Sequence, residues 1–410
     1  MKSLKSFITE EKNTHMTHVE DLVFDKGVDG ARSAINFLRD LRDMLSGHTN
    51  SKINATVKWD GAPAIFCGID PRDKKFFVAK KGVFNATPKV YKTAKDIDSD
   101  TSGDLAAKLK VALTEFSKLG ITSGVYQGDL MFTNDKKREK IMGKDYITFH
   151  PNTIVYAVPT TSTLGQNIAK AKIGVVWHTM YTGTSFENMR ASFGQNIVSK
   201  FRKVPTIWQD DATYRDYSGT ATFTSRETEH LTSILSQAGR VFQGVNANTL
   251  NAMSKAENPE LNQLINTYNN TKVRAGEKIT NTRLHTQGLY HYIHDKYQKE
   301  IEKRKSDKGK SAQEEKRKAI LKFFADHDQG EIARIFDLVN LLAEAKQMII
   351  NKMNEAGSIQ TFLKTTNGFK VTGVEGFVAI DRIGSAVKIV DRMEFSKANF
   401  SPDIIKGWQK

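Results

Sequence analysis

The sequence predicts an α+β protein in which a β-rich unit is divided by a large helical insertion. Three observations support this: β-rich runs fill residues 53–182, helical periodicity dominates about 186–365, and β character returns at 369–395. We therefore expect antiparallel sheets flanked by helices. The expected units are an N-terminal helical segment that packs on the core, the divided β-rich domain, and the inserted helical domain, at residues 1–50, 51–185 plus 366–410, and 186–365.

Hydrophobic spacing and turn residues define the individual elements. A first helix is expected at residues 29–46, with Asp29 as its cap and Gly47 as its stop. Apolar residues at helical spacing predict further helices at 104–118 and Glu331–Ala356. Runs rich in β-branched and aromatic residues predict strands at Ile53–Lys58, Ala64–Ile69, Lys75–Lys80, Gly124–Phe132, Thr153–Val158, Lys172–Tyr181, Phe369–Val374, Phe377–Ile380 and Ala386–Val390.

Composition narrows the class of protein. The 410 residues carry a net charge of +15, which favours a polyanionic partner, most often nucleic acid; a solubility charge or a basic membrane-surface protein are the alternatives. The single cysteine, Cys67, excludes a disulfide framework and a cysteine zinc site. Met1–Thr17 has no apolar core of a signal peptide, and no run approaches about 18 apolar residues. We expect a cytoplasmic monomer without membrane contact.

Six short motifs, in a fixed order on strand-like segments, could carry chemistry. They read Lys58-Trp59-Asp60-Gly61, Ala79-Lys80-Lys81-Gly82, Tyr126-Gln127-Gly128-Asp129-Leu130, Val175-Val176-Trp177-His178, Glu375-Gly376-Phe377-Val378 and Ala386-Val387-Lys388-Ile389-Val390. Each alone is weak, and the first could be a surface turn. Their order and strand context are more specific than any single match.

The series resembles the motifs of the covalent-nucleotidyltransferase superfamily, which comprises DNA ligases, RNA ligases and mRNA capping enzymes. Lys58, Asp60 and Gly61 are similar to motif I, and Lys80 lies where that family has the arginine of its S-R-x-G segment. Asp129 takes the place of the motif III glutamate. The remaining matches are Trp177 to the aromatic of motif IIIa, Glu375 with Gly376 to motif IV, and Lys388 to motif V. The resemblance covers roughly 50–182 and 368–395, and it implies a ligase-type nucleotidyltransferase fold.

The resemblance also implies roles for these residues. Lys58 would carry AMP from ATP, and Mg²⁺ or Mn²⁺ would be bound by Glu375 and Asp129. Asp129 would also hold the ribose hydroxyls, while Trp177 stacks on adenine. The implied catalytic residues are Lys58, Asp60, Glu375 and Lys388. The implied nucleotide-binding residues are Thr56, Val57, Lys58, Gly61, Lys80, Asp129, Trp177, Glu375 and Lys388.

Physical chemistry supports such a lysine. An amine is a nucleophile only when it is neutral, and burial or neighbouring cations lower its pKa. Lys80 and Lys388 would supply cations, and both suit the non-bridging oxygens of a phosphate. Glu375 suits Mg²⁺, which prefers carboxylate and water ligands. His150 and His178, which lie in or near strands, are interpreted as core or hydrogen-bonded histidines.

The sequence departs from the family pattern at several positions. Pro63 stands where motif I carries arginine or asparagine, and Thr56 stands where adenine-selecting ligases often have glutamate. Ile380 and Val390 replace lysines of motifs IV and V. The lost positive charge could come from other cations of the chain, namely Lys81, Arg382 or Arg392.

A charge-dense stretch lies within the expected insertion. Residues 296–322 hold eleven lysines and arginines against five acidic residues, so this stretch is either a solvated helical face or a clamp on phosphate backbones. The residues expected to contact nucleic acid are Lys303, Arg304, Lys305, Lys308, Lys310, Lys316, Arg317 and Lys318.

Taken together, we expect an ATP-dependent polynucleotide ligase that joins 3′-hydroxyl and 5′-phosphate ends through a lysyl-AMP intermediate. Only about 22 residues follow Lys388, too few for the OB-fold barrel of capping enzymes and most DNA ligases. The expected substrate is a nicked duplex of DNA, RNA or a hybrid. The alternatives are an mRNA-capping-type guanylyltransferase and an inactive nucleic-acid-binding phage protein. The form without an OB-fold is similar to bacteriophage enzymes, which would place the protein in the host cytoplasm.

Overall fold

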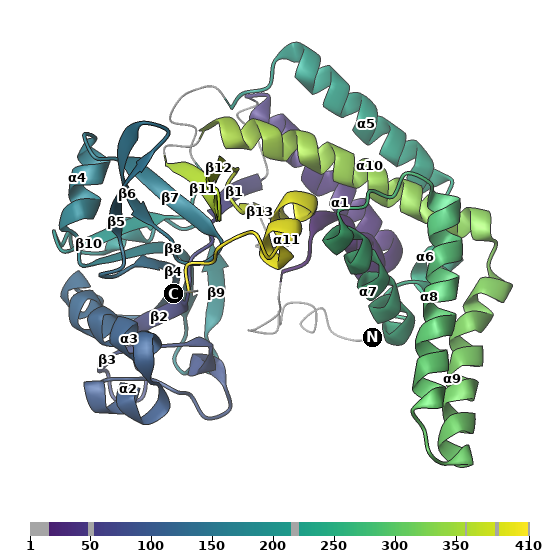
Figure 1. The fold of residues 1–410 in the computed structure, drawn as a ribbon, viewed down its shortest axis with the longest axis horizontal. Helices are drawn as coiled ribbons and strands as arrows, with labels where there is room; N and C mark the ends of the chain where they lie inside the picture. Colours follow the sequence, from purple (N-terminus) through teal and green to yellow (C-terminus); the bar gives the residue numbers. More distant parts are fainter. Residues whose placement is uncertain (1–15, 48–52, 215–220, 357–358, 382–384, 409–410) are drawn as a thin grey trace.

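Strands and helices occupy different parts of the computed structural model, with the sheets on one side and the long helices on the other (Figure 1). The structure describes residues 16–47, 53–214, 221–356, 359–381 and 385–408. The α-helices are α1 Leu22–Leu45, α2 Ala94–Asp100, α3 Gly103–Phe116, α4 Thr163–Lys170, α5 Ser225–Gln243, α6 Ala247–Ala252, α7 Pro259–Ala275, α8 Thr282–Glu302, α9 Asp307–Asp326, α10 Gln329–Met353 and α11 Arg392–Phe400. The presence of both helices and sheets confirms the predicted α+β class.

Fourteen strands are described, and several are close to the predicted ranges. They are β1 Ile53–Lys58, β2 Ala64–Ile69, β3 Phe76–Ala79, β4 Val125–Phe132, β5 Lys137–Ile141, β6 Lys144–Phe149, β7 Ile154–Pro159, β8 Ile173–Thr182, β9 Arg190–Phe193, β10 Ile207–Asp211, β11 Gln360–Thr365, β12 Gly368–Val371, β13 Gly376–Asp381 and β14 Ala386–Ile389. Short 3-10 helices include η2 Val19–Asp21 and η6 Asn354–Ala356.

The described strands form three sheets. The small sheet has the order β1-β13-β14, the large sheet β10-β8-β4-β2-β3 with β9 on β8, and the third sheet β12-β11-β7-β6-β5. All pairings are antiparallel except that of β10 with β8. Since β1 pairs with β13 and β7 pairs with β11, strands from both sides of the long helical stretch meet in the same sheets. The sheets are therefore built from segments on both sides of the helical stretch.

The helical insertion is shorter than predicted. β9 and β10 bond to β8, so the β unit continues to Asp211, and β11 already begins at Gln360. The helices α5 to α10 with η6 fill residues 225–356, not 186–365. The added strands are short and lack the alternation of apolar and polar residues by which a strand is predicted.

α1 contains the predicted helix, which begins just after Gly27, and adds a helical segment from Leu22 that a kink separates from it. The chain kinks at Gly27, whose φ of 57° lies in the left-handed region, and then continues as a helix, so Asp29 is not its cap. The backbone N–H of Val28 at the kink donates to the side chain of Asn251 (3.1 Å), on α6. The kink thus ties α1 to the insertion.

One core joins α1, the inserted helices and the inner face of the small sheet. It contains Leu38 of α1, Phe336 of α10, Ala55 of β1, and Phe377 and Ile389 of β13 and β14, all buried. Successive side chains of a strand point to opposite faces. Since Ala55 and Ile53 face the helices, Thr56 and Lys58 face away from them, toward the large sheet.

The longest projection of the helical half is the hairpin of α8 and α9, which pack side by side and extend away from the sheets (Figure 1). Its turn contains the three consecutive cations at 303–305. None of the helices in the described part of the chain combines the length and apolar character that crossing a bilayer requires.

Candidate functional site

Three segments that are far apart in the sequence meet at the end of β1. Lys58 lies opposite Gly376 in the β1–β13 register, and Val378 lies opposite Lys388 in the β13–β14 register. The Lys58 ammonium forms an ion pair with the carboxylate of Glu375, which precedes β13. The two side chains are 26% and 12% exposed, so the pair is largely shielded but reachable. The structure thus brings together the predicted Lys58, Glu375 and Lys388.

Burial perturbs the ionisation of this group. It raises the pKa of Glu375 to about 7, although the Lys58 ammonium opposes the shift. Burial also lowers the pKa of Lys388, and Lys58 adds to that effect by charge repulsion. Perturbed carboxylates and amines that share a half-buried site are typical of catalytic centres.

Asp60 is buried and supports the turn that follows Lys58. Its buried carboxylate accepts hydrogen bonds from the backbone N–H groups of Thr153 (2.6 Å) and Ile154 (2.8 Å) and from the Asn152 amide (2.8 Å). Its own N–H donates to the Tyr156 hydroxyl (2.7 Å). Burial raises the pKa of Asp60 despite these bonds. With its acceptors in use, Asp60 fixes the turn after Lys58 against β7, which is a positioning role.

Asp129 and His178 come from the large sheet and face the lysine. Asp129 of β4 lies directly beside Gly61, where an added Cβ would fall 2.5 Å from the Asp129 Cβ. Burial raises the pKa of Asp129 to about 7, and the Lys58 ammonium opposes this shift. The His178 imidazole lies 3.9 Å from the Asp129 carboxylate, and burial lowers its pKa to about 4. The imidazole is therefore neutral near pH 7.

A β-bulge lies where β8 passes the site. The β4–β8 register shifts between Gln127 and Gly128, which lie opposite Thr179 and Trp177, so His178 is the extra residue. Bulges of this kind change the direction of a side chain. The His178 ring is also bonded to the Thr179 hydroxyl (2.7 Å), which holds it on the face of Asp129.

Trp177 does not occupy the place expected of a base-stacking aromatic. Its side chain has no exposed surface and packs on Phe116 and Phe201 on the helical side of the large sheet. Its ring N–H donates to Gln209 (3.1 Å). This corrects the expectation that Trp177 stacks on adenine. Val175 and Trp177 lie on one face of the strand, an alternation in the sequence that could have indicated the core.

The other predicted nucleotide contacts divide between two faces. Thr56 lies on the face of Lys58 and is buried where β1 meets Thr213. Val57 points the opposite way, into a cavity of about 80 Å³ that Trp59 and Phe377 also line, which corrects its assignment to the nucleotide site.

Lys80 is bonded elsewhere than predicted. Its ammonium pairs with Asp100 (3.0 Å), whereas Lys81, next in the chain, lowers the pKa of Asp129 by its charge. Of the cations considered as replacements for the missing lysines, Lys81 is therefore close enough to act on Asp129 by its charge. Arg392 is bonded to Asp21 (2.9 Å). Arg382 lies outside the described residues.

The two expected metal ligands fit a hard cation only in part. No group of three or more His, Cys, Asp and Glu side chains within the described ranges is close enough to hold a metal ion by itself. Glu375 and Asp129 nevertheless face one space, and each pKa is raised by the burial of its negative charge. Mg²⁺ commonly uses one or two carboxylates together with substrate phosphates and water. Glu375 and Asp129 are the residues that would hold it.

The predicted nucleic-acid contacts lie on the α8–α9 hairpin. Lys303, Arg304 and Lys305 form its exposed turn. Arg317 is less available, because it pairs with Glu314 (2.6 Å) and donates to Gln298 (2.8 Å). The further predicted residues on α9, mostly exposed, are Lys308, Lys310, Lys316 and Lys318.

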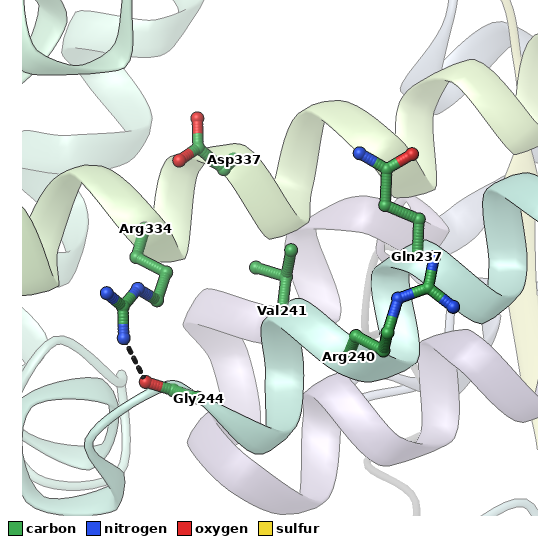
Figure 2. Close-up of a pocket in the computed structure, with 6 residues that line it drawn as sticks. All are labelled: Gln237, Arg240, Val241, Gly244, Arg334 and Asp337. Carbon is green, nitrogen blue, oxygen red and sulfur yellow. Dashed lines mark hydrogen bonds between the residues drawn. The ribbon is translucent and has the colours of Figure 1, made fainter.

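A separate hollow of about 340 Å³ lies between α5 and α10 (Figure 2). Figure 2 shows the Arg334 guanidinium bonded to the Gly244 carbonyl (2.6 Å) across the two helices. None of the residues predicted from the motifs lines this hollow, so it is not part of the site around Lys58.

Comparison with known proteins gives a family but no activity. The sequence matches the family described as "Family of unknown function (DUF6267)" over residues 13–403. No curated protein and no solved structure matches the chain.

Proposed function

Because the chain belongs to the family of unknown function DUF6267, we propose its activity from the site itself: it is an ATP-dependent polynucleotide ligase that works through a lysyl-AMP intermediate. The proposal rests on the ion pair of Lys58 with Glu375 and on Lys388 in the neighbouring strand. These are the residues that the motif resemblance assigns to one site, and the β1-β13-β14 register supports that assignment. The small sheet and the face of the large sheet that carries Asp129 are in turn compatible with a ligase-type nucleotidyltransferase fold.

The first step is the transfer of AMP to Lys58. The ammonium first loses a proton, and Glu375 is placed to accept it, since its pKa of about 7 suits proton exchange near neutrality. The neutral Nζ attacks the α-phosphorus of ATP, a phosphorus–nitrogen bond forms, and the bond to pyrophosphate breaks. Lys388 offsets negative charge on the phosphoryl oxygens. A bound Mg²⁺ would add further neutralisation of the phosphates.

The next two steps join the ends. The 5′-phosphate of the nucleic acid displaces Lys58 from AMP, which gives a pyrophosphate-linked adenylate and restores the amine. The 3′-hydroxyl then attacks that 5′-phosphate, and AMP leaves as the phosphodiester forms. Phosphoryl transfer of this kind depends on positioning and charge stabilisation more than on additional covalent chemistry.

His178 takes the place that the resemblance gave to an aromatic residue. In the proposal, the neutral imidazole contacts the nucleotide beside Asp129, which holds the ribose hydroxyls. Thr56 lies on the same face as Lys58. In the proposal, small polar groups distinguish adenine from guanine. Both ATP and GTP are therefore included in the test.

Intact-mass spectrometry after incubation with Mg²⁺ and either ATP or GTP tests the proposal. With ATP, the wild type should gain the mass of one AMP, and Lys58→Ala should gain none. Lys95→Ala, which removes an exposed lysine, is the matched control and should label like the wild type. Labelling by GTP alone would favour a capping-type guanylyltransferase. An unlabelled wild type that still binds nucleic acid would favour an inactive binding protein.

Sealing assays then define the substrate. Nicked duplexes with DNA or RNA on either side of the nick should separate a DNA ligase from an RNA ligase. An enzyme that accepts AMP from ATP but seals none of these substrates would exclude the nicked duplex as its substrate.

A further inference from the structure

Exposed aromatic and cationic side chains gather where α7 and α11 meet. Phe400, at the end of α11, is 62% exposed, and the guanidinium of Arg274, at the end of α7, lies 4.6 Å from its ring centre. Lys397, one turn before Phe400, lies against Gly276 at the end of α7. Trp408, farther along the chain, is 67% exposed. We call Arg274, Lys397, Phe400 and Trp408 the α7–α11 patch.

Trp408 is held in a fixed place close to the candidate site. Its ring N–H donates to the Asn152 side chain (3.3 Å), and the N–H of Gly407 donates to the Asn152 carbonyl (2.7 Å). A Cβ on Gly407 would fall 1.7 Å from the His150 carbonyl oxygen, so the chain presses directly on this loop. Asn152 also donates to Asp60 (2.8 Å). An exposed indole is therefore attached to the loop that positions the turn after Lys58.

The patch spans both halves of the molecule. α11 packs on α7, and the segment after α11 runs from the helical half to the sheets (Figure 1). Phe400 lies at the start of this segment and Trp408 near its end. A ligand that covers both rings would therefore cross the junction in front of the loop at Asn152.

The charges of the patch select its ligand. Arg274 and Lys397 are exposed, and in the described part of the chain neither has a carboxylate within ion-pair distance. Exposed aromatic faces combined with cations that lack acidic partners suit a chain of phosphates and flat bases. An apolar protein surface would leave both cations without a counter-charge.

We propose that the α7–α11 patch binds a single-stranded segment of nucleic acid, with bases stacked on Phe400 and Trp408 and phosphates beside Arg274 and Lys397. The location of this segment next to the end that is joined rests on the proposed function, but its affinity for single strands does not. The patch would hold a strand that is unpaired near the ligation site.

Intrinsic fluorescence provides a direct test, because Trp408 is the exposed one of the four tryptophans, while Trp59 is half-buried and Trp177 and Trp208 are buried. A single-stranded oligonucleotide should quench the fluorescence of the wild type. An abasic oligonucleotide of equal length, which keeps the phosphates, should quench it much less. Trp408→Phe should abolish the quenching while the protein still binds. Titrations in the Lys58→Ala background exclude any contribution from adenylylation.

Affinity measurements complete the test. The double variant Phe400→Ala, Trp408→Ala should bind the intact oligonucleotide at least about thirtyfold more weakly, as expected for the loss of two stacked bases, and should bind the abasic strand almost unchanged. Met142→Ala, which removes another exposed apolar side chain, is the control. Unfolding transitions verify that each variant folds.

Equal quenching by both oligonucleotides, or wild-type affinity of the double variant, would overturn the proposal and assign the patch to a protein contact. Normal binding in a protein that never accepts AMP would refute the proposed function alone. Normal AMP transfer without single-strand binding at the patch would refute this inference alone.

Discussion

Lys58 is paired with Glu375 at the point where β1 ends beside the start of β13, so the proposed nucleophile is in contact with a carboxyl group. The pair keeps a charged lysine stable in a half-buried place. It also gives the proton a destination, because the acceptor is already in contact with the amine.

The pH dependence of AMP transfer should follow Glu375. Its pKa of about 7 means that the carboxylate is protonated at lower pH and cannot accept the proton of Lys58. The single-turnover rate should therefore rise with pH, at or below about pH 7, because Mg²⁺ bound to Glu375 would lower this pKa. Glu375→Gln should lose this rise and slow transfer roughly 10²- to 10⁴-fold. A variant that keeps the wild-type profile would show that another group takes the proton.

The pH dependence of the free energy of unfolding should show that the buried Asp129 carboxylate destabilises the folded protein above pH 7. Its pKa is raised from 3.8 to about 7, so the folded protein holds this proton more tightly than the unfolded chain. The resulting stability is complete below pH 3.8 and is lost as pH rises toward 7. Asp129→Asn should therefore match the wild type in acid and be more stable by about 2–4 kcal/mol above pH 7. Urea unfolding at several pH values measures the difference, and a constant difference would contradict it.

Replacement of Asp60 should weaken the whole site through its support. Asp60→Ala leaves the buried N–H groups of Thr153 and Ile154 without acceptors, at roughly 1–3 kcal/mol each. We expect a loss of about 3 kcal/mol or more in the free energy of unfolding, measured with urea. Asp295→Ala, at an exposed position, should be neutral. A fully stable Asp60→Ala with lost activity would instead indicate direct contact with the substrate.

Substitution of Trp177 should lower stability, whereas substitution of His178 should weaken nucleotide binding. Trp177→Ala removes a fully buried side chain and should cost about 3–5 kcal/mol, measured by chemical unfolding. His178→Ala should leave stability nearly unchanged and raise the KM for ATP, since His178 faces Asp129. The reverse pattern would restore Trp177 as the base-contacting residue.

The turn of the α8–α9 hairpin should contribute to nucleic-acid binding alone. Replacement of Lys303, Arg304 and Lys305 by glutamine should reduce affinity and lower the slope of log K against log salt by up to about three. AMP transfer to Lys58 should not change. An equal fall in AMP transfer would contradict the clamp role.

A matched triple variant controls for the loss of charge. It removes three exposed lysines of the β5–β6 hairpin, which are Lys137, Lys140 and Lys144. A comparable loss of affinity in this control would indicate that net charge, not the α8–α9 turn, sets the binding.

The strands that carry the motifs could be predicted because their patterns are local. β1 and β2 have the predicted bounds, since each is a short run of strand-forming residues that ends at a turn. The meeting of Lys58, Glu375 and Lys388 followed from the resemblance, and the register of the small sheet agrees with it.

Features that depend on tertiary pairing escaped prediction. The β-bulge beside His178 exists only in the pairing of β4 with β8, and no sequence pattern marks it. The bonds that occupy Asp60 come from residues 152–154, which are distant in sequence. The partner of Lys80, Asp100, likewise lies on a neighbouring helix whose position a linear pattern does not give.

The shared core of the small sheet and the long helices has a consequence for engineering. Ala55 and Phe377 pack against the same apolar interior as Phe336 of α10, so the strand that presents Lys58 is built on the helices that interrupt the sequence. Residues 225–356 therefore cannot be deleted without removing part of the core beneath β1 and β13. A shortened version that reconnects the chain across this gap would expose the underside of β1 to water and lose its nucleophile along with its helices.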